Sequence, residues 1–313
     1  MSVDGPASSV WKPPLGDGVE ECWAEVDGAR MRYLRAGSGP PVVLLHGLLG
    51  YSFSWRFTIP ALVKRWTVIA PDLPGTGFSD RAVGLDHSLR ATAQRLLRFV
   101  EKIGLSSFDL VGTSHGGAVA MMAAAECVRG ATSLQIERLV LVAPVNPYSP
   151  HGKRLAPFLG SRIGSTLFRA VVPLFPVTQA YWLQRMFGNR ARVPADSLAG
   201  YRAPLAVPGL FEHGLAIVRT WESDLNELEA ALPTISSMTV LLMWGEKDGA
   251  VYASSSVPLA ECFSNAHTVT FNGIGHLPYE ECPEAFNREL VRFLENGHSS
   301  AEKQDVEREM RRN

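Results

Sequence analysis

The sequence has few cysteines, no excess of one charge and no long apolar run. Its four cysteines, Cys22, Cys127, Cys262 and Cys282, lie far apart and form no C-x-x-C pair. This spacing argues against a zinc site and against a disulfide framework, and it fits a reducing compartment. The formal net charge is only -1, so the total charge gives no reason to expect nucleic acid or an anionic membrane as a partner.

We also expect neither a targeting segment nor a membrane-spanning segment. The start of the chain has an early Asp4 and lacks the basic and apolar segments of a secretory signal. The longest apolar-rich stretch, residues 118–125, is far shorter than the roughly 20 residues that a helix needs to span a bilayer. We therefore expect a soluble, cytoplasmic protein without a membrane span or a nucleic-acid partner, while the oligomeric state stays open.

The sequence does contain regularly alternating strand-like and helix-like segments. Short aliphatic runs bounded by Gly, Pro or Asp are typical of strands buried on both faces. Such runs lie at 41–47, 66–72, 108–114, 136–144, 238–245 and 266–273, and helical patterns lie at 88–103, 116–128, 252–261 and 283–295. This alternation predicts the α/β class, with a mostly parallel sheet and helices on both faces. An Asp27-Gly28 turn between two earlier runs predicts an antiparallel hairpin at one edge.

One long segment interrupts the alternation and suggests a division into domains. Residues 146–221 contain no clear buried strand and are rich in proline, arginine and aromatic residues, which predicts a mostly helical insertion. The α/β core would then comprise residues 22–145 and 222–296. Residues 1–21 are rich in Gly, Pro and Ser, and residues 297–313 are highly charged, so we expect a flexible segment at each end.

A serine between glycines lies where a predicted strand meets a predicted helix. In "LVGTSHGG" the pattern G-x-S-x-G places Gly112 and Gly116 two residues on either side of Ser114. In a tight strand-to-helix turn the serine is forced into an unfavourable backbone conformation, and its neighbours must lack a Cβ. This is the nucleophile elbow of acyl-transfer enzymes, in which the turn exposes the serine hydroxyl.

A serine hydroxyl needs a histidine to take its proton and a carboxylate to orient that histidine. Asp248 lies just after a predicted strand, and His276 lies in a Gly-rich loop before the last helical segment. The order Ser, acid, His along the chain is the one expected for this architecture. The sequence therefore predicts a catalytic triad of Ser114, Asp248 and His276.

Acyl transfer also requires hydrogen-bond donors for the oxyanion. One expected donor is the backbone N–H of His115, the residue after the nucleophile. The second is the backbone N–H of Leu48, in the loop after the strand "PVVLLHG". Because the chemistry uses only these protein groups, we expect no metal and no cofactor.

Together these segments resemble the α/β-hydrolase fold family over residues 22–296. The motifs that carry the resemblance are "HGLLGYSFSW" (46–55), "DLPGTGFSD" (72–80), "GTSHGG" (112–117), "WGEKDGAV" (244–251) and "GIGHLPYEECPEAF" (273–286). The resemblance implies the same triad, and it implies that the helical insertion 146–221 is a cap that covers the active site. It says much less about the substrate, because one fold supports many reactions.

Within the family, epoxide hydrolases and haloalkane dehalogenases have an aspartate where this chain has Ser114. A carboxylate suits alkyl transfer and a serine suits acyl transfer, so the resemblance favours neither of those activities. Carbon–carbon bond hydrolases of ring-fission products use a serine and a similar cap. They typically contain an H-G-x-G-P-G-like stretch, from which "HGLLGY" departs.

Aromatic residues of the insertion suggest an apolar substrate pocket. We expect Phe175, Trp182, Phe187 and Phe211 to bind substrate, with packing inside the cap as the alternative for each. Arginines of the insertion could bind a substrate carboxylate or form a solvated helix face. The favoured function is a carboxylesterase-like serine hydrolase acting on a small to medium, largely apolar ester through an acyl-enzyme. The alternatives are a carbon–carbon bond hydrolase or thioesterase with the same triad, and a ligand receptor with little turnover.

Overall fold

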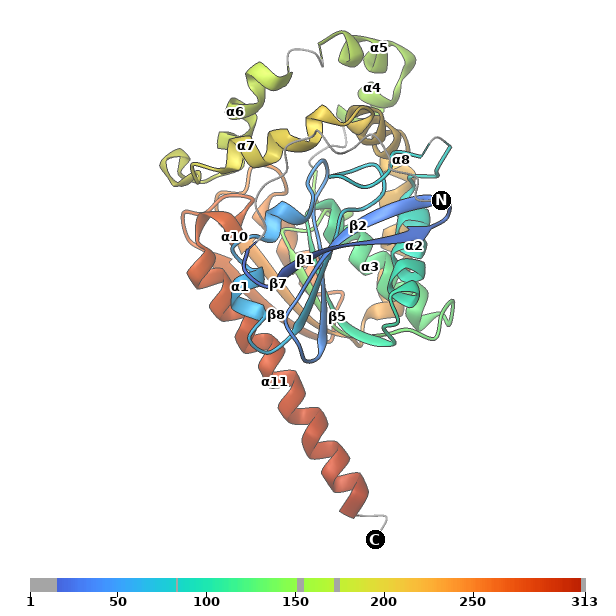
Figure 1. Ribbon diagram of the computed structural model, residues 1–313, viewed down its shortest axis with the longest axis vertical. Coiled ribbons are helices and arrows are strands. Elements are labelled where there is room, and N and C mark those ends of the chain that lie inside the picture. The colour runs from blue at the N-terminus through green and yellow to red at the C-terminus, as the bar shows by residue number, and fades with distance from the viewer. Residues whose placement is uncertain (1–15, 83, 151–154, 172–174, 311–313) are drawn as a thin grey trace.

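The computed structural model describes residues 16–310, except residues 83, 151–154 and 172–174. Within them, eight strands form one sheet in the order β1-β2-β4-β3-β5-β6-β7-β8 (Figure 1). The strands are β1 (Val19–Val26), β2 (Ala29–Ala36), β3 (Pro41–Leu45), β4 (Thr67–Pro71), β5 (Ser107–Thr113), β6 (Gln135–Val142), β7 (Thr239–Gly245) and β8 (Asn265–Phe271). The pairs from β4 through β8 are parallel, so the predicted α/β class is confirmed.

The first two strands form the predicted hairpin at one edge of the sheet. Strands β1 and β2 pair in antiparallel register with Val26 opposite Ala29, and β2 also runs antiparallel to β4. The two turn residues, Asp27 and Gly28, both have positive φ values, of 53° and 74°. A two-residue turn of this kind matches the right-handed twist of the strands, and Asp-Gly is one of the pairs that adopt it most readily.

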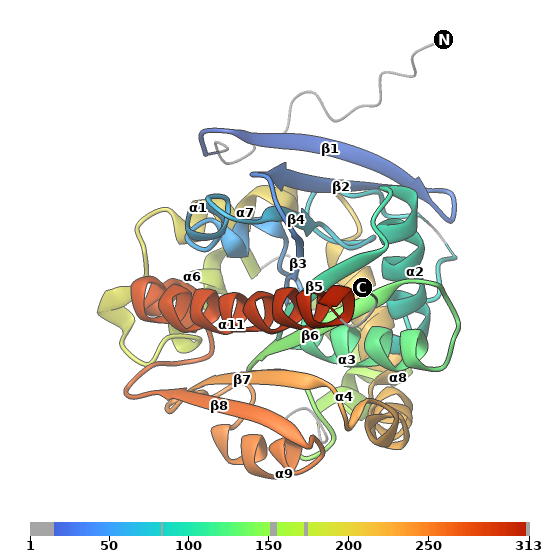
Figure 2. The same ribbon diagram turned by 90° about the horizontal axis from the view of Figure 1, so that it is seen from below.

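Helices cover both faces of the sheet (Figure 2). Alternate side chains of β3 point to opposite faces: Val43 and Leu45 belong to one apolar cluster, and Val42 and Leu44 belong to the other. The first cluster includes side chains of α2 and α3, and the second includes side chains of α1 and α11. These four helices and two others are α1 (Ile59–Leu62), α2 (Leu89–Lys102), α3 (His115–Val128), α9 (Ser256–Ala260), α10 (Pro278–Glu281) and α11 (Pro283–Met310).

Between β6 and β7 the described chain is helical, without a strand. These helices gather at one end of the molecule (Figure 1). They are α4 (Leu155–Gly160), α5 (Arg162–Val171), α6 (Phe175–Arg185), α7 (Ser197–Arg202) and α8 (Leu210–Ala231). The expected domain boundary at residue 221 falls inside α8. The helix continues because Leu225, Leu228 and Ala231 belong to the same apolar cluster as α2 and α3.

The two ends of the chain also differ from expectation. Strand β1 begins at Val19, three residues before the expected start of the core, and residues 1–15 lie outside the described residues. Residues 297–310, expected to be a loose tail, continue the backbone of α11, which extends away from the sheet (Figure 1). Its last ten residues, 301–310, contain three Glu and one each of Ala, Lys, Arg, Gln and Met, which favour helix. Among the described residues, no helix is both long and apolar enough to cross a membrane.

Candidate active site

Ser114 occupies the turn between β5 and α3, as the motif predicts. Its φ is 53° and its ψ is -122°, a conformation that costs a non-glycine residue on the order of 1–3 kcal/mol. The surrounding backbone holds it there: the Ser114 N–H donates to the Val142 carbonyl at 2.9 Å, and the Ser114 carbonyl accepts from the Val145 N–H at 2.9 Å. Both bonds attach the serine to the end of β6 and the loop that follows it.

The flanking glycines are required by close backbone contacts. A Cβ on Gly112 would lie 2.4 Å from the carbonyl oxygen of Gly116, and one on Gly116 would lie 2.3 Å from that of His46. Atoms do not approach so closely without displacing the backbone. The prediction that both neighbours of the serine must lack a Cβ is therefore confirmed.

His276 and Asp248 come together from two loops at the same edge of the sheet. Asp248 follows β7, and its Oδ1 accepts from the backbone N–H groups of Ala250 at 2.8 Å and Val251 at 2.9 Å. Its Oδ2 lies 2.7 Å from Nδ1 of His276, and both side chains are buried. A carboxylate only accepts hydrogen bonds, so Nδ1 of His276 is the protonated nitrogen and Nε2 is left to act as an acceptor.

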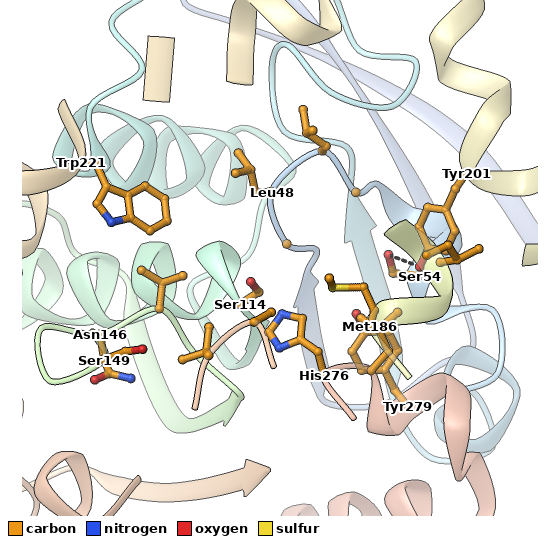
Figure 3. A pocket seen from close by; sticks show the side chains of 18 of the residues that line it. Leu48, Ser54, Ser114, Asn146, Ser149, Met186, Tyr201, Trp221, His276 and Tyr279 are labelled. Atoms are coloured by element: carbon orange, nitrogen blue, oxygen red, sulfur yellow. Dashed lines mark hydrogen bonds between the residues drawn. The ribbon is translucent and has the colours of Figure 1, made fainter. Parts of the chain in front are cut away.

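The same cavity contains Ser114 and His276. It has a volume of about 310 Å³ and is lined by both residues and by loops that follow β3, β6 and β7. Figure 3 shows the ring of His276 beside Ser114 among the side chains that line this cavity. The fold thus brings the predicted serine and histidine to one cavity, with Asp248 hydrogen-bonded behind the histidine.

The two residues expected to supply oxyanion donors lie near Ser114. His115 begins α3, where the first backbone N–H groups have no acceptor inside the helix. Leu48 lines the cavity, and a Cβ on the preceding Gly47 would lie 3.0 Å from the Cβ of Ser114. The loop after β3 therefore passes in close contact with the serine.

Two buried histidines shape the surroundings of the serine. The Nδ1 of His46 lies 2.8 Å from the Gly47 carbonyl, to which it donates, and its Nε2 accepts from the Leu73 N–H at 3.0 Å. Burial lowers the pKa of His46, and it lowers the pKa of His115 to about 4. The His115 ring stacks on Trp221 with 6.3 Å between ring centroids. Both rings are therefore neutral near pH 7, and they support the loops around the cavity.

The helices between β6 and β7 line the cavity with residues other than those expected. Trp182 is half exposed, Phe187 is buried in the cluster with α11, and Phe211 packs edge-on against Phe168. None of these three is among the described lining residues. Phe175 lies outside the residues whose side chains are described. The helical side of the lining consists instead of Leu183, Met186, Tyr201, Trp221 and Leu225.

Size and aromatic character, on which the four expected substrate-binding residues rest, do not show where a side chain points. Trp182 and Leu183 are adjacent on α6, yet only Leu183 lines the cavity. Side chains one residue apart on a helix point about 100° apart. The composition of the insertion therefore predicts an apolar lining but cannot select its members.

Two adjacent carboxylates in "YEECPEAF" were not identified as site residues from the sequence. The Glu281 carboxylate accepts three backbone N–H groups, those of Gly188, Asn189 and Gly275, each at 2.8 Å. The His276 N–H donates to the Met186 carbonyl at 2.7 Å. These bonds tie the histidine loop to the segment after α6. The signal in the sequence was the pair of adjacent glutamates four and five residues after His276, the histidine of the predicted triad.

Glu280 connects the other side of the cavity to α7. Its carboxylate accepts from the Tyr201 hydroxyl, from Arg56 Nη2 at 3.0 Å and from Ser197 Oγ at 3.2 Å. The Tyr201 hydroxyl is hydrogen-bonded to Oγ of Ser54 at 3.1 Å, and both residues line the cavity, as Figure 3 shows. Burial and the neighbouring Glu280 raise the pKa of Tyr201 far above its usual value, so its hydroxyl stays protonated.

Comparisons with known proteins point to one family. Residues 40–283 match the sequence model of the alpha/beta hydrolase fold. Haloalkane dehalogenase 2 of Mycobacterium tuberculosis is 28% identical over 87% of this chain and 94% of its own length. Monoacylglycerol lipase ABHD6 of Bos taurus is 26% identical over 89% of this chain and 86% of its own length.

A solved structure shows the same fold. The meta-cleavage product hydrolase CumD of Pseudomonas fluorescens superposes with a TM-score of 0.72 at 24% identity, over 88% of this chain and 97% of the other. Similarity at this level of identity concerns the fold. The family model, by contrast, spans most of the sequence. The chain therefore belongs to the α/β-hydrolase fold family.

Proposed function

We propose that this protein is a serine hydrolase that cleaves a carboxylic ester of a small to medium, largely apolar substrate. The observation that carries the proposal is the hydrogen bond between Nδ1 of His276 and Asp248, at 2.7 Å, behind a ring that shares a cavity with Ser114. A histidine oriented in this way next to a strained serine is the arrangement that activates an alcohol as a nucleophile.

The reaction follows from the positions of these groups. His276 accepts the Ser114 proton at Nε2 while the Ser114 Oγ attacks the ester carbonyl carbon. The N–H groups of His115 and Leu48 donate to the resulting oxyanion. The tetrahedral intermediate then breaks its bond to the alcohol, which leaves with the proton from His276. Water, deprotonated by the same histidine, attacks the acyl-enzyme and releases the acid and free Ser114.

A hydroxyl at the elbow supports acyl transfer over the alkyl transfer named for some relatives. A carboxylate nucleophile displaces a leaving group from carbon and forms an ester that water can hydrolyse. Ser114 would form an ether in the same displacement, and an ether has no carbonyl that water could attack. The similarity to a haloalkane dehalogenase therefore supports the family and not that reaction.

The chemistry of the lining supports an apolar acyl group. Leu183, Met186, Val145, Leu225 and Val251 supply hydrocarbon surface, and the volume is at the lower end of the range for small-molecule sites. No lysine or arginine is among the described lining residues. A ring-fission product carries a carboxylate, which a buried cation would be expected to bind. The lining thus supports an ester over that alternative.

The test is a panel of p-nitrophenyl esters of graded acyl length, assayed beside a ring-fission dienoate and an acyl thioester. We expect oxygen esters of short to medium length to give the highest kcat/KM, and the dienoate to be inert. Ser114→Ala serves as the control for background hydrolysis. Faster turnover of the dienoate or the thioester than of every oxygen ester would contradict the proposed substrate class.

A further inference from the structure

The outer surface of α5 exposes aliphatic side chains to solvent. Ile163, Leu167 and Val171 are spaced four residues apart, so they share one face of the helix. Their exposed fractions are 73%, 54% and 56%. Only Gly164 and Ser165 of this helix are buried. The polarity of α5 is thus the reverse of that expected for a helix packed on a protein core.

Two other helices at the same end of the molecule also expose aromatic residues. Phe158 of α4 and Tyr181 and Trp182 of α6 are each about half exposed, and Figure 1 shows α4, α5 and α6 at the end of the molecule farthest from the C-terminus. We define the cap face by its six exposed apolar side chains: Phe158, Ile163, Leu167, Val171, Tyr181 and Trp182. Exposed apolar side chains gathered at one end of a molecule and accompanied by polar residues are typical of interaction sites.

The local charge identifies the kind of partner. Between Glu137 and Asp196 the sequence contains no acidic residue but eight basic ones. The rest of the chain has nine more acidic than basic residues, so the near-neutral total conceals a strongly basic region. Its exposed members include Arg162 at the start of α5 and Arg185 at the end of α6, which lie beside the apolar side chains of the cap face.

Three contacts reduce this local charge without removing it. Arg138 is buried in an ion pair with Asp109, and Arg169 pairs with Glu212 of α8 at 2.9 Å. The second pair also fixes α5 to α8. A Glu281 carboxylate oxygen lies 3.9 Å from Nη1 of Arg192. Outside these pairs, the described segments of the acid-free stretch still contain Arg162, Arg185 and Arg190, so the stretch itself keeps a net positive charge.

We propose that the cap face docks on an anionic lipid surface. Aliphatic and aromatic side chains together with arginines form the combination that holds an amphipathic helix in the headgroup region of a bilayer. Trp and Tyr prefer this interface, and each arginine near an anionic surface adds to the attraction. Helix α6 connects this surface to the cavity, because Leu183 on the same helix lines the cavity.

The test measures binding alone, so it does not depend on the proposed hydrolysis. The full chain is sedimented with vesicles of phosphatidylcholine, and with vesicles that also contain phosphatidylglycerol. We expect the wild type to sediment with the anionic vesicles and much less with the neutral ones. Replacing the apolar pair by Ile163→Asp and Leu167→Asp should lower the partition coefficient by more than tenfold.

Matched variants separate the cap face from general surface effects. Val257→Asp changes a residue of α9 with an exposed fraction of 63%, and it should bind as the wild type does. Arg162→Gln and Arg185→Gln should each weaken binding to anionic vesicles by about fivefold. Arg292→Gln removes a positive charge from the exposed surface of α11, outside the cap face, and should leave binding to anionic vesicles nearly unchanged.

Several outcomes would overturn the proposal. One is a wild type that does not sediment with anionic vesicles at low salt, and another is an Ile163→Asp/Leu167→Asp variant that binds like Val257→Asp. Light scattering gives a third: a wild-type dimer that this double variant dissociates would make the cap face a contact between copies. Thermal unfolding of each variant confirms that the substitutions leave the fold intact.

Discussion

The two walls of the cavity are built in different ways. On the sheet side, backbone hydrogen bonds and close contacts hold Ser114 and Asp248 in nearly fixed positions. On the helical side, Leu183 and Met186 shape the cavity. The helical segment is attached to the rest of the protein by hydrogen bonds to the carboxylates of Glu281 and Glu280. The comparison suggests that reactivity belongs to the sheet side and substrate choice to the helical side.

The largest effect should come from removing the nucleophile. Ser114→Ala removes the hydroxyl and leaves the turn and its backbone contacts in place, so kcat should fall on the order of 10⁵–10⁶-fold with the fold intact. Steady-state kinetics on the best p-nitrophenyl ester, with a thermal melt as control, measure this. Turnover near the wild-type rate would break the assignment of reactivity to the sheet side.

Asp248→Asn should cost on the order of 10⁴-fold in kcat. The amide can turn its oxygen to the N–H groups of Ala250 and Val251, and its NH₂ then faces Nδ1 of His276 and favours the wrong tautomer. KM should change little because Asp248 does not line the cavity. A higher KM with an unchanged kcat would contradict this role and would mean that Asp248 contributes to substrate binding.

A stability effect should come from the buried His115 beneath Trp221. Its pKa is lowered to about 4, below the unfolded value of about 6.5. Between these values the unfolded chain binds more protons, so the free energy of unfolding falls as the pH drops from about 6.5 to 4. The total for His115 is about 3 kcal/mol, with a slope of up to about 1.4 kcal/mol per pH unit.

Denaturant unfolding at pH 7, 6 and 5 measures this dependence, and His115→Gln should show a shallower slope than the wild type. Burial also lowers the pKa of His46 and His213, so some slope should remain in the variant. Equal slopes for variant and wild type would contradict a neutral, buried His115.

A smaller effect on activity is expected where the two walls meet. Glu281→Gln leaves one side-chain oxygen to accept from the three backbone N–H groups that the carboxylate now binds. The NH₂ group that replaces the other oxygen cannot accept a hydrogen bond. At least one buried N–H therefore loses its acceptor, at a cost of about 1–3 kcal/mol. Because Gly275 precedes His276, kcat should fall about tenfold. Glu284→Gln, exposed at the start of α11, is the matched control and should behave as wild type.

The smallest effect should concern selectivity. Met186→Ala and Leu183→Ala enlarge the cavity on the helical side, so kcat/KM for the best ester should fall a few-fold and the optimum should move to a longer acyl chain. Trp182→Ala, on the same helix but half exposed, should leave the acyl-length profile unchanged. A shift in Trp182→Ala equal to that of its neighbours would contradict the lining described here.

The sheet and its site loops could be predicted from the sequence because their signals are local. Runs of aliphatic residues identify strands, and Gly112, Ser114 and Gly116 form a turn that few residues can adopt. In parallel strands the carboxyl ends share one edge, so the order of Ser114, Asp248 and His276 along the chain was enough to place them near one another.

The helical side could not be predicted in the same way. Which of Trp182 and Leu183 faces the cavity depends on how α6 is rotated, and long-range bonds such as those of Glu281 to residues 188 and 189 set that rotation. Nor did the net charge of the whole chain reveal the basic, acid-free stretch. That signal was present in the sequence but is visible only when charge is counted segment by segment.

The most direct test of the central claim is covalent labelling with a fluorophosphonate, followed by intact-mass measurement and peptide mapping. The proposed site predicts one adduct per chain, on the peptide that contains Ser114, with slower labelling in His276→Ala and none in Ser114→Ala. A folded wild-type protein that takes up no label, or that is labelled at another residue, would contradict the claim.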